Sequence, residues 1–532
     1  MSFDPETIHR RRWATLAVLC LSLVLVIVGN TVLNVALPTL VRELDATNSE
    51  LQWMVDAYAL VFAGLLLTAG ALGDRFGRKH ALNVGLIIVA AGALFAAFAD
   101  SAGQIIGARA VMGVGASLVM PATLSILASV FPPDERPRAI AIWAGLSGAG
   151  AAIGPVASGF LLEHFWWGSV FLLNLPIIVV ALAAGQVLVP NSKDPHETPL
   201  DPVGAALSIV GLGALVYAII EAPVHGWTAA QTLGAFALAA VTLVGFGLWE
   251  HKTPDPMLDL NFFRRPAFAS GAGAITLTFF AMFGTFFLLS QLFQFVLDYS
   301  PLETGIRMLP MAGTMMLVAP NSARIAERIG TRLTMATGLG LVGIALLCFT
   351  TTSADSGYLA VLYPLIIMAV GMALTMAPAT GAIMVSLPLA KAGVGSAVND
   401  TTRELGGALG VAIQGSLVAA TYSSKIDDAL PAGLPTEARV AARSSLGAAL
   451  EIARQTNVPQ LADDARTGFV HGLHVANLAG AGVVFLAAVL VLKFMPSKVE
   501  HHPEVGGQRG PLHDEADARA MAGALEAEAL EP

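Results

Sequence analysis

Fourteen apolar segments dominate this chain of 532 residues, and each is long enough to cross a lipid bilayer. A helix that spans the hydrocarbon core needs about 20 mostly apolar residues. Apolar residues make up 55% of the chain and charged residues only 13%, whereas soluble domains carry about 25% charged residues. The chain is therefore predicted to be an all-helical integral membrane protein. The predicted spans are residues 14–38, 51–73, 81–99, 103–127, 139–162, 168–189, 203–220, 231–250, 267–297, 304–323, 333–352, 359–384, 394–421 and 468–492.

Positive charges in the short loops predict which side of the membrane each end of the chain occupies. Cytoplasmic loops carry an excess of Lys and Arg. With fourteen spans, both termini and the alternate loops share one side, and the short loops opposite hold only Arg42 and Arg307. The cations on the shared side are Arg10, Arg11, Arg12, Arg75, Arg78, Lys79, Arg136, Arg138, Lys193, Lys252, Arg264, Arg265, Arg324, Arg328, Arg332 and Lys391. Both termini are therefore predicted to be cytoplasmic.

The chain also repeats itself. Residues 326–332 (AERIGTR) echo residues 73–79 (GDRFGRK), and the same offset places the first span on the ninth. Spans 9 to 14 are thus predicted to copy spans 1 to 6, with spans 7 and 8 as an insert, giving 6+2+6 helices. The predicted parts are a cytoplasmic arm 1–13, a six-helix bundle 14–189, an inserted two-helix hairpin with flanking loops 190–266, a second six-helix bundle 267–496 containing an extracellular loop 423–467, and a disordered cytoplasmic tail 497–532.

A second echo concerns glycines. Those of span 5 recur in span 13, and small residues at this spacing let helices approach closely. The two helices, one from each half, are predicted to form the seam about which the halves rock, with the substrate site at the midplane between the bundles. The matching residues are Gly150, Gly154 and Gly159 in span 5 and Gly406, Gly410 and Gly415 in span 13.

The loop from Gly70 to Leu82 (GALGDRFGRKHAL) places three cations and one Asp between two apolar runs. Its glycines allow two helices to turn back within a few residues. The loop resembles the signature loop of the major facilitator superfamily at nearly every specified position. The resemblance implies a conformational switch, in which Asp74 and Arg75 form a cytoplasmic clasp that holds the halves together in the outward-open state. Alternatively, the cations only set the topology.

Further motifs narrow this resemblance. Span 5 (GAGAAIGPVASG) is similar to the antiporter motif of the superfamily, with Pro155 between Gly154 and Gly159. Residues 30–38 (NTVLNVALP), residues 53–58 (WMVDAY) and residues 300–310 (SPLETGIRMLP) resemble motifs of the fourteen-helix drug:proton antiporters, the multidrug exporters of the QacA, EmrB and LfrA type. The predicted switch residues are Gly73, Asp74, Arg75, Gly77, Arg78, Gly150, Gly154, Pro155 and Gly159.

Acidic side chains inside the spans are the candidates for carrying a proton: Asp56 in span 2, and Asp400 and Glu404 in span 13. An acid in hydrocarbon is costly, and burial favours its protonated form, as a proton carrier requires. Asp400 and Glu404 lie one helical turn apart, and Arg403 can hold one of them charged while the other titrates. The alternative is a static salt bridge that locks span 13.

Arg109 is the lone cation of span 4. The family resemblance implies a part in proton transfer, because a fixed buried cation can displace a proton from a nearby acid. The alternative is that Arg109 binds a backbone carbonyl or Asp56. The family usually has an Asp one residue before Asn30, where this chain has Gly29. Proton coupling is therefore expected to depend on the remaining acids.

The substrate-binding candidates are Asn30, Asn34, Tyr58, Phe279, Phe283 and Phe286. The first three lie in the family motifs, and the Phe residues recur at helical spacing on span 9. Flat aromatic faces attract lipophilic cations. A Phe stripe on a membrane helix can equally face lipid or a neighbouring helix.

These patterns predict a proton-coupled antiporter that exports lipophilic or cationic compounds across the bacterial inner membrane. Its expected partners are the substrate, protons and membrane lipid, without nucleic acid, and it is expected to be a monomer without a cofactor. The two cysteines lie in apolar runs, and neither a disulfide, a metal site nor an enzyme centre is predicted. The alternatives are a dedicated exporter of one endogenous metabolite, such as an antibiotic or an envelope lipid, and a non-transporting sensor or enzyme of the same fold. The loop 423–467 is either an extracellular lid or a tolerated insertion.

Overall fold

The computed structural model describes residues 5–132, 135–192, 201–254, 256, 258–387, 392–431 and 434–497, and nearly all of them are helical. The predicted tail lies outside these residues from position 498 onward. The helices are α1 (Pro5–Leu44), α2 (Asn48–Phe76), α3 (Arg78–Ala97), α4 (Ala102–Val130), α5 (Arg136–His164), α6 (Ser169–Leu172), α7 (Asn174–Leu188), α8 (Pro202–His225), α9 (Ala230–Lys252), η1 (Leu260–Arg264), α10 (Pro266–Gln291), η2 (Leu292–Val296), α11 (Pro301–Ile329), α12 (Thr331–Phe349), α13 (Leu359–Val385), α14 (Ala392–Ala429), α15 (Thr436–Ser444), α16 (Leu446–Thr456) and α17 (Pro459–Phe494).

The internal repeat is visible in how two helices begin and end. Helix α2 starts with a capping box, in which Thr47 and Glu50 satisfy each other's backbone N–H groups, and α11 starts with the same device. The glycines that end them, Gly77 and Gly330, have φ angles of 112° and 90°, which a residue with a side chain rarely adopts. Both helices are 29 residues long. Helices α2 and α11 thus share their length, the signal that begins them and the glycine that ends them.

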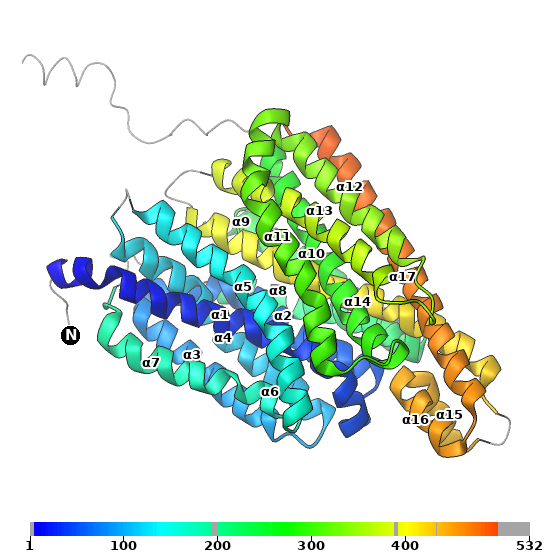
Figure 1. The fold of residues 1–532 in the computed structure, drawn as a ribbon. Helices are drawn as coiled ribbons and strands as arrows, with labels where there is room; N and C mark the ends of the chain where they lie inside the picture. The colour runs from blue at the N-terminus through cyan, green and yellow to red at the C-terminus, as the bar shows by residue number, and fades with distance from the viewer. Residues whose placement is uncertain are drawn as a thin grey trace, which may run out of the picture.

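The helices pack in two groups (Figure 1). In the first group α1 packs against α4, α5 and α7, while α4 also packs against α2 and α3. In the second group α10 packs against α13, α14 and α17, while α12 packs against α13 and α17. The two largest contacts between the groups are those of α5 with α11 and of α14 with α2. The sequence repeat relates α2 to α11 and α5 to α14. Each of the two contacts therefore joins the fifth helix of one half to the second helix of the other.

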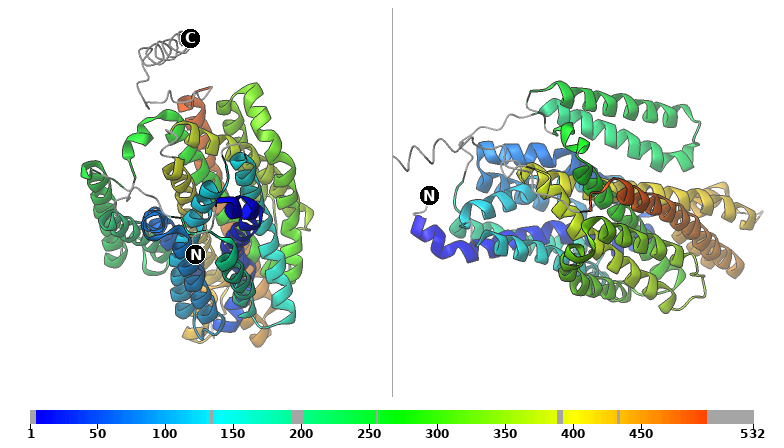
Figure 2. Two further views of the ribbon diagram at one scale, coloured as in Figure 1. Left: turned by 90° about the vertical axis from the view of Figure 1, so that its left-hand side faces the viewer. Right: turned by 90° about the horizontal axis from the view of Figure 1, so that it is seen from above.

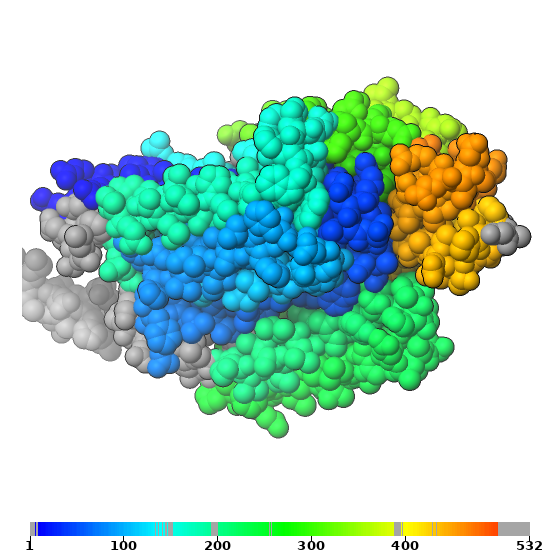
Figure 3. Space-filling model, turned by 90° about the horizontal axis from the view of Figure 1, so that it is seen from below, coloured from blue at the N-terminus to red at the C-terminus, as the bar shows by residue number. Residues whose placement is uncertain are grey.

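Two helical hairpins lie outside the two groups. Helices α8 and α9 pack against each other along one side, where α8 contacts both α2 and α14 (Figure 2). The second hairpin, α15–α16, occupies one end of the molecule (Figure 3). It contacts α14 and α17 and reaches α1 of the first group. We call this end of the bundles the hairpin end, and the opposite end, which holds Arg11, Arg78 and Arg264, the basic end.

Twelve helices in the described residues are long and apolar enough to cross a membrane. This is two fewer than the fourteen spans that the sequence predicts. The difference concerns α5 and α11, which are each 29 residues long but are not among the twelve. Both helices lie at the contact between the groups, and each has proline within the helix. Each also carries exposed apolar side chains, such as Ile153 and Phe160 of α5 and Met316 and Leu317 of α11.

An ion pair at the basic end fixes the start of α1. Arg12 donates to both carboxylate oxygens of Glu135, at 2.6 and 2.9 Å, and this hydrogen bonding lowers the pKa of Glu135 below its usual value. A lowered carboxyl pKa stabilises the fold above the unfolded-state pKa, which is about 4.3 for Glu, and the effect is lost as pH falls through the folded-state pKa.

We therefore expect Glu135→Gln to lower the melting temperature of the purified protein at pH 7. This difference should shrink as pH falls below about 4 and vanish below the folded-state pKa of Glu135, where the wild-type side chain is neutral as well. Equal melting temperatures at pH 7 would show that the pair contributes nothing. Glu451→Gln is the matched control, since Glu451 has a lowered pKa through Arg454 but lies in the α15–α16 hairpin.

Candidate functional site

The first element of the site is a carboxyl group enclosed within the first bundle. Asp56 lies on α2, and its exposed fraction is 0%. Neither of its oxygens has a hydrogen-bond partner in the described chain. A buried polar group without a partner costs roughly 1–3 kcal/mol, and more if it is charged. Asp56 is therefore an enclosed acid whose oxygens are left unsatisfied by the described residues.

The second element is Arg109 on α4, which is also fully buried. Its Nε donates to the carbonyl of Met54 at 3.0 Å, and its NH1 group donates to the carbonyl of Gly29 at 2.8 Å. The guanidinium lies 4.3 Å from the centre of the Tyr58 ring. Arg109 therefore joins α4 to α1 and α2 through backbone carbonyls. Binding to a backbone carbonyl was the alternative to a role in proton transfer. The ion pair with Asp56 that the same alternative allowed is not found among the described residues.

The third element is the acidic group of α14 in the second bundle. Arg403 lies 3.5 Å from Asp400, which also accepts a hydrogen bond from Asn399 at 3.3 Å. Glu404 lies one turn further along α14, where it interacts electrostatically with Arg403 and Asp400 of its own helix and with Arg109 of the first bundle. The predicted pairing of Asp400 with Arg403 is thus present.

The aromatic residues of span 9 face the protein interior. Phe279 is 5% exposed and lies under the Arg403 guanidinium, with 4.8 Å between the charge and the ring centre. Phe283 stacks on Phe279 at 5.9 Å and abuts Gly407 of α14. Phe286 is half-buried. The lipid-facing alternative is therefore wrong for Phe279 and Phe283, which pack against α14.

The other substrate candidates are enclosed as well. Tyr58 is 2% exposed, packs on Phe62, and donates a long hydrogen bond of 3.4 Å to the carbonyl of Val26. Asn34 is 2% exposed, and neither atom of its amide has a partner in the described residues. Asn30 is nearly as buried, and its oxygen lacks a partner. In this conformation Tyr58 supports Arg109, and the two amides are enclosed polar groups.

The glycines of α5 and α14 sit where helices approach closely, but the two helices do not form one pair. A side chain at Gly154 would meet Thr31 of α1, and one at Gly159 would lie 2.5 Å from the carbonyl oxygen of Pro301 of α11. In α14, Gly406 and Gly410 approach the backbone of α10, while Gly415 meets Gln52 of α2. The structure therefore corrects the prediction of a single seam formed by spans 5 and 13, because α5 and α14 lie in two separate contacts. Each of these helices packs against the second helix of the opposite bundle.

The signature loop forms a tight turn at the basic end. Arg78 donates to Asp74 at 2.8 Å, so this ion pair lies within the loop and does not bridge the bundles. Gly77 takes the left-handed conformation that ends α2 and begins α3. Arg75 stacks on the ring of Phe76. Gly73 abuts Ala81, the packing expected where two helices turn back on each other.

Sequence reasoning missed several buried polar groups at the hairpin end. Gln294 of η2 donates to the carbonyl of Val35 at 2.8 Å, and Ser416 of α14 lies 3.4 Å from Gln52 of α2. Both hydrogen bonds join the two bundles. Asn174 at the start of α7 is 1% exposed and lies beside Gly29. The available signal was a polar side chain inside an apolar run, which predicts burial but not the partner.

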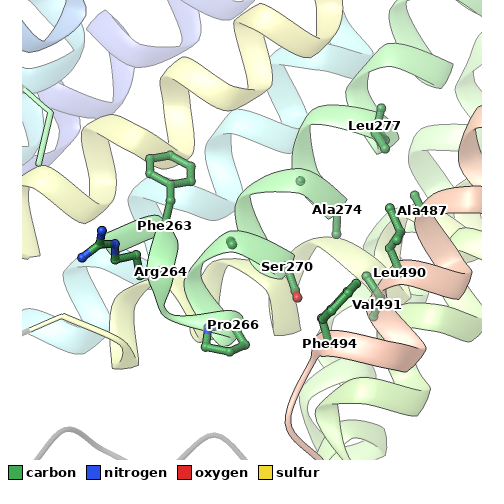
Figure 4. A pocket seen from close by; sticks show the side chains of 12 residues that line it. Phe263, Arg264, Pro266, Ser270, Ala274, Leu277, Ala487, Leu490, Val491 and Phe494 are labelled. Atoms are coloured by element: carbon green, nitrogen blue, oxygen red, sulfur yellow. The ribbon is translucent and has the colours of Figure 1, made fainter. Parts of the chain in front are cut away.

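An apolar groove of about 390 Å³ lies away from these residues. It is formed by η1, α10 and α17 at the basic end, with Phe263, Pro266, Leu277, Leu490 and Phe494 among its lining side chains (Figure 4). None of the predicted site residues lines it. No cluster of three or more metal-ligating side chains occurs within the residues that the structure describes.

Two bundles of membrane helices around enclosed acids and a fixed arginine define a helical membrane transporter. The chain belongs to the Major Facilitator Superfamily, whose family model matches residues 19–411. It is 37% identical over 485 residues to the multidrug efflux pump LfrA of Mycolicibacterium smegmatis, covering 90% of this chain and 96% of that one. It is 33% identical to the methyl viologen resistance protein SmvA of Salmonella typhimurium, over 92% and 99% of the two chains. The tetracenomycin C resistance and export protein of Streptomyces glaucescens is 31% identical, over 93% and 94%.

Solved structures show the same fold. A bacterial homologue of the human lysosomal transporter Spinster, in an inward-facing conformation, matches with a TM-score of 0.63 over 91% of this chain and 98% of that one, at 17% identity. The peptide transporter POT matches with a TM-score of 0.60 over 92% and 98%, at 15% identity. The major facilitator fold predicted from the sequence is therefore confirmed.

Proposed function

We propose that this protein exports lipophilic, cationic compounds from a bacterial cytoplasm in exchange for protons. The observation that carries the proposal is Asp56, a fully buried carboxyl group without a hydrogen-bond partner in the described chain. The names of the relatives, which describe multidrug efflux and resistance to methyl viologen, support the class of substrate. Methyl viologen is itself an organic cation.

In the proposed cycle, the protein holds a proton on Asp56 or Glu404 while the substrate site is open to one side. Arg109 stays charged, and its distance from Glu404 changes when the bundles move, because the two residues lie on opposite bundles. A nearer guanidinium favours release of the proton, and a more distant one favours its uptake. Asp400, which is paired with Arg403, contributes less to the titration.

The proposal includes a full arrangement of 6+2+6 membrane helices in the inner membrane, with both termini cytoplasmic and a monomeric state. The lengths and positions of α5 and α11 support fourteen spans, since each is long enough to cross a bilayer. The basic end would then face the cytoplasm. Hydrogen bonds between the bundles at the hairpin end, such as that from Gln294 to Val35, would close the outer side. Switching would act through the signature loop and the α5 glycines.

Export should depend on the proton gradient and not on ATP, because no P-loop pattern occurs in the sequence. We expect an ionophore that collapses the gradient at constant ATP to stop the efflux of a fluorescent cationic dye from cells that express the protein. Proteoliposomes with an imposed pH gradient and no nucleotide should take up the dye. Undiminished efflux after collapse of the gradient would refute the antiport mechanism.

A second candidate function is export of a single antibiotic made by the same organism. The 31% identity to the tetracenomycin C export protein favours it. Growth of an efflux-deficient host on a panel of dyes, biocides and antibiotics distinguishes the two. Resistance to several unrelated cations supports the multidrug function, whereas resistance to one compound class alone supports the dedicated exporter.

A further inference from the structure

A polar pocket of about 410 Å³ lies at the basic end, on the outer face of the first bundle. It is lined by residues of α3, of α7 and of the segment that follows α7, and α3 and α7 pack against each other. The lining residues are Lys79, His80, Asn83, Gln186 and Asn191. Each of them can donate a hydrogen bond, and none is acidic. The volume lies within the range of about 300–1,000 Å³ that is usual for ligand sites.

The cation of this pocket is held in place. Lys79 donates from Nζ to the carbonyl oxygens of Gln186 and Val189, at 3.0 and 2.9 Å. An ammonium group has three N–H donors, so one remains for a ligand. A second cation lies close by, since Arg11 of α1 donates to the carbonyl of Val187 at 3.0 Å. The nearest acid of the signature loop, Asp74, is already paired with Arg78.

Apolar surface continues from the pocket toward the middle of the membrane. Ile87, one turn after Asn83 on α3, is 55% exposed, and on α7 Val187 and Val180 are 58% and 55% exposed. A fixed cation with amide donors above an exposed apolar strip matches the shape of a phospholipid, with its phosphate at one end and its acyl chains at the other. Basic pockets between membrane helices on the cytoplasmic side bind anionic headgroups.

We propose that this pocket binds an anionic membrane phospholipid, with the phosphate at Lys79 and Asn83 and an acyl chain along Ile87 and Val187. Lys79 thus has a role separate from that of Asp74, Arg75 and Arg78 in the same loop. The lipid would tie the start of α3 to the end of α7. It would also make the behaviour of the signature loop depend on the composition of the membrane.

Native mass spectrometry of the purified protein with equal amounts of phosphatidylglycerol and phosphatidylcholine tests this site. We expect wild type to retain phosphatidylglycerol preferentially and Lys79→Gln to retain about fivefold less, the effect of one cation at a membrane surface. Asn83→Leu should also reduce retention, and it leaves the two hydrogen bonds of Lys79 to α7 intact. Lys493→Gln is the matched control, because Lys493 is an exposed lysine at the same end, on α17, and does not line the pocket.

Three outcomes would overturn the proposal. Wild-type retention in Asn83→Leu, or an equal loss in Lys493→Gln, would place the lipid elsewhere. Stabilisation of the lipid-free protein by inorganic phosphate as large as that by phosphatidylglycerol would assign the pocket to a free anion. If Lys79→Gln fails to fold because α7 loses its contacts, Asn83→Leu alone decides the question.

Discussion

Asp56→Asn should reduce proton-driven export to about a tenth of the wild-type rate or less, because a titrating acid buried in a membrane helix is removed with little change of volume. The other two candidate acids lie on α14 of the second bundle, so Asp56 is the candidate that belongs to the first bundle. Substrate should still bind, because the side chain is fully enclosed. The measurement is dye efflux from energised cells at matched expression, together with dye binding to the purified variant.

The matched control for this substitution is Asp298→Asn. Asp298 pairs with Arg466 at the hairpin end, and its side chain is 68% exposed. Its neutralisation should leave efflux unchanged. Glu404→Gln should be the next most harmful change, because Glu404 interacts electrostatically with Arg109 of the other bundle, whereas Asp400→Asn should be milder, because Asp400 is paired with Arg403 on its own helix. Normal drug resistance with all three acids neutralised would refute proton coupling through carboxyl groups.

The fold could be predicted from the sequence because its signals are periodic and local. Long apolar runs specify membrane helices, and glycine with a polar turn specifies where they reverse. The repeat that links α2 to α11 extends to Thr47 and Ser300, the capping residues, which each accept a hydrogen bond from a Glu backbone N–H. A sequence repeat of this kind requires no knowledge of tertiary contacts.

The site could be predicted only as a set of residues, without their partners. A buried Asp or Arg is recognisable because it is rare in an apolar run. Which carbonyl satisfies Arg109 depends on how α1 and α2 cross α4, and no local pattern encodes that crossing. The partners of the glycine-rich helices α5 and α14 could not be predicted either. The spacing of their glycines predicts close packing but not the partner, which for Gly159 is α11, the second helix of the other half.

Position Gly29 illustrates the same limit. The sequence shows that an expected acid is missing there, but not what occupies the space. In the structure, the amide of Asn174 lies 3.7 Å from the position that a Gly29 side chain would take, and the carbonyl of Gly29 binds Arg109. The residue at position 29 therefore helps to hold Arg109 through its backbone carbonyl, a group that every amino acid has. The polar side chain beside this position comes from α7, and its amide has no hydrogen-bond partner among the described residues.

Gly159→Leu should abolish transport while the protein remains folded in the membrane. A Cβ atom at this position would lie 2.5 Å from the carbonyl oxygen of Pro301 and 2.6 Å from Cα of Leu302, and both are backbone atoms that a rotamer change cannot move. The opposite face is equally tight, since a side chain at Gly305 would lie 2.4 Å from the carbonyl oxygen of Pro155. Helices α5 and α11 therefore touch through their backbones at the hairpin end, and a leucine would hold them apart.

Alternating access requires the bundles to pass between two packed arrangements, and the variant cannot reach the one in which this seam is closed. We expect efflux below about a tenth of the wild-type rate, with cysteine accessibility at the hairpin end increased. Gly107→Leu is the control, because Gly107 lies on α4 with no atom within 4 Å of the added Cβ. Gly305→Leu should reproduce the defect from the other bundle. Wild-type efflux in Gly159→Leu at normal membrane levels would show that closure of the α5–α11 seam is not part of the transport cycle.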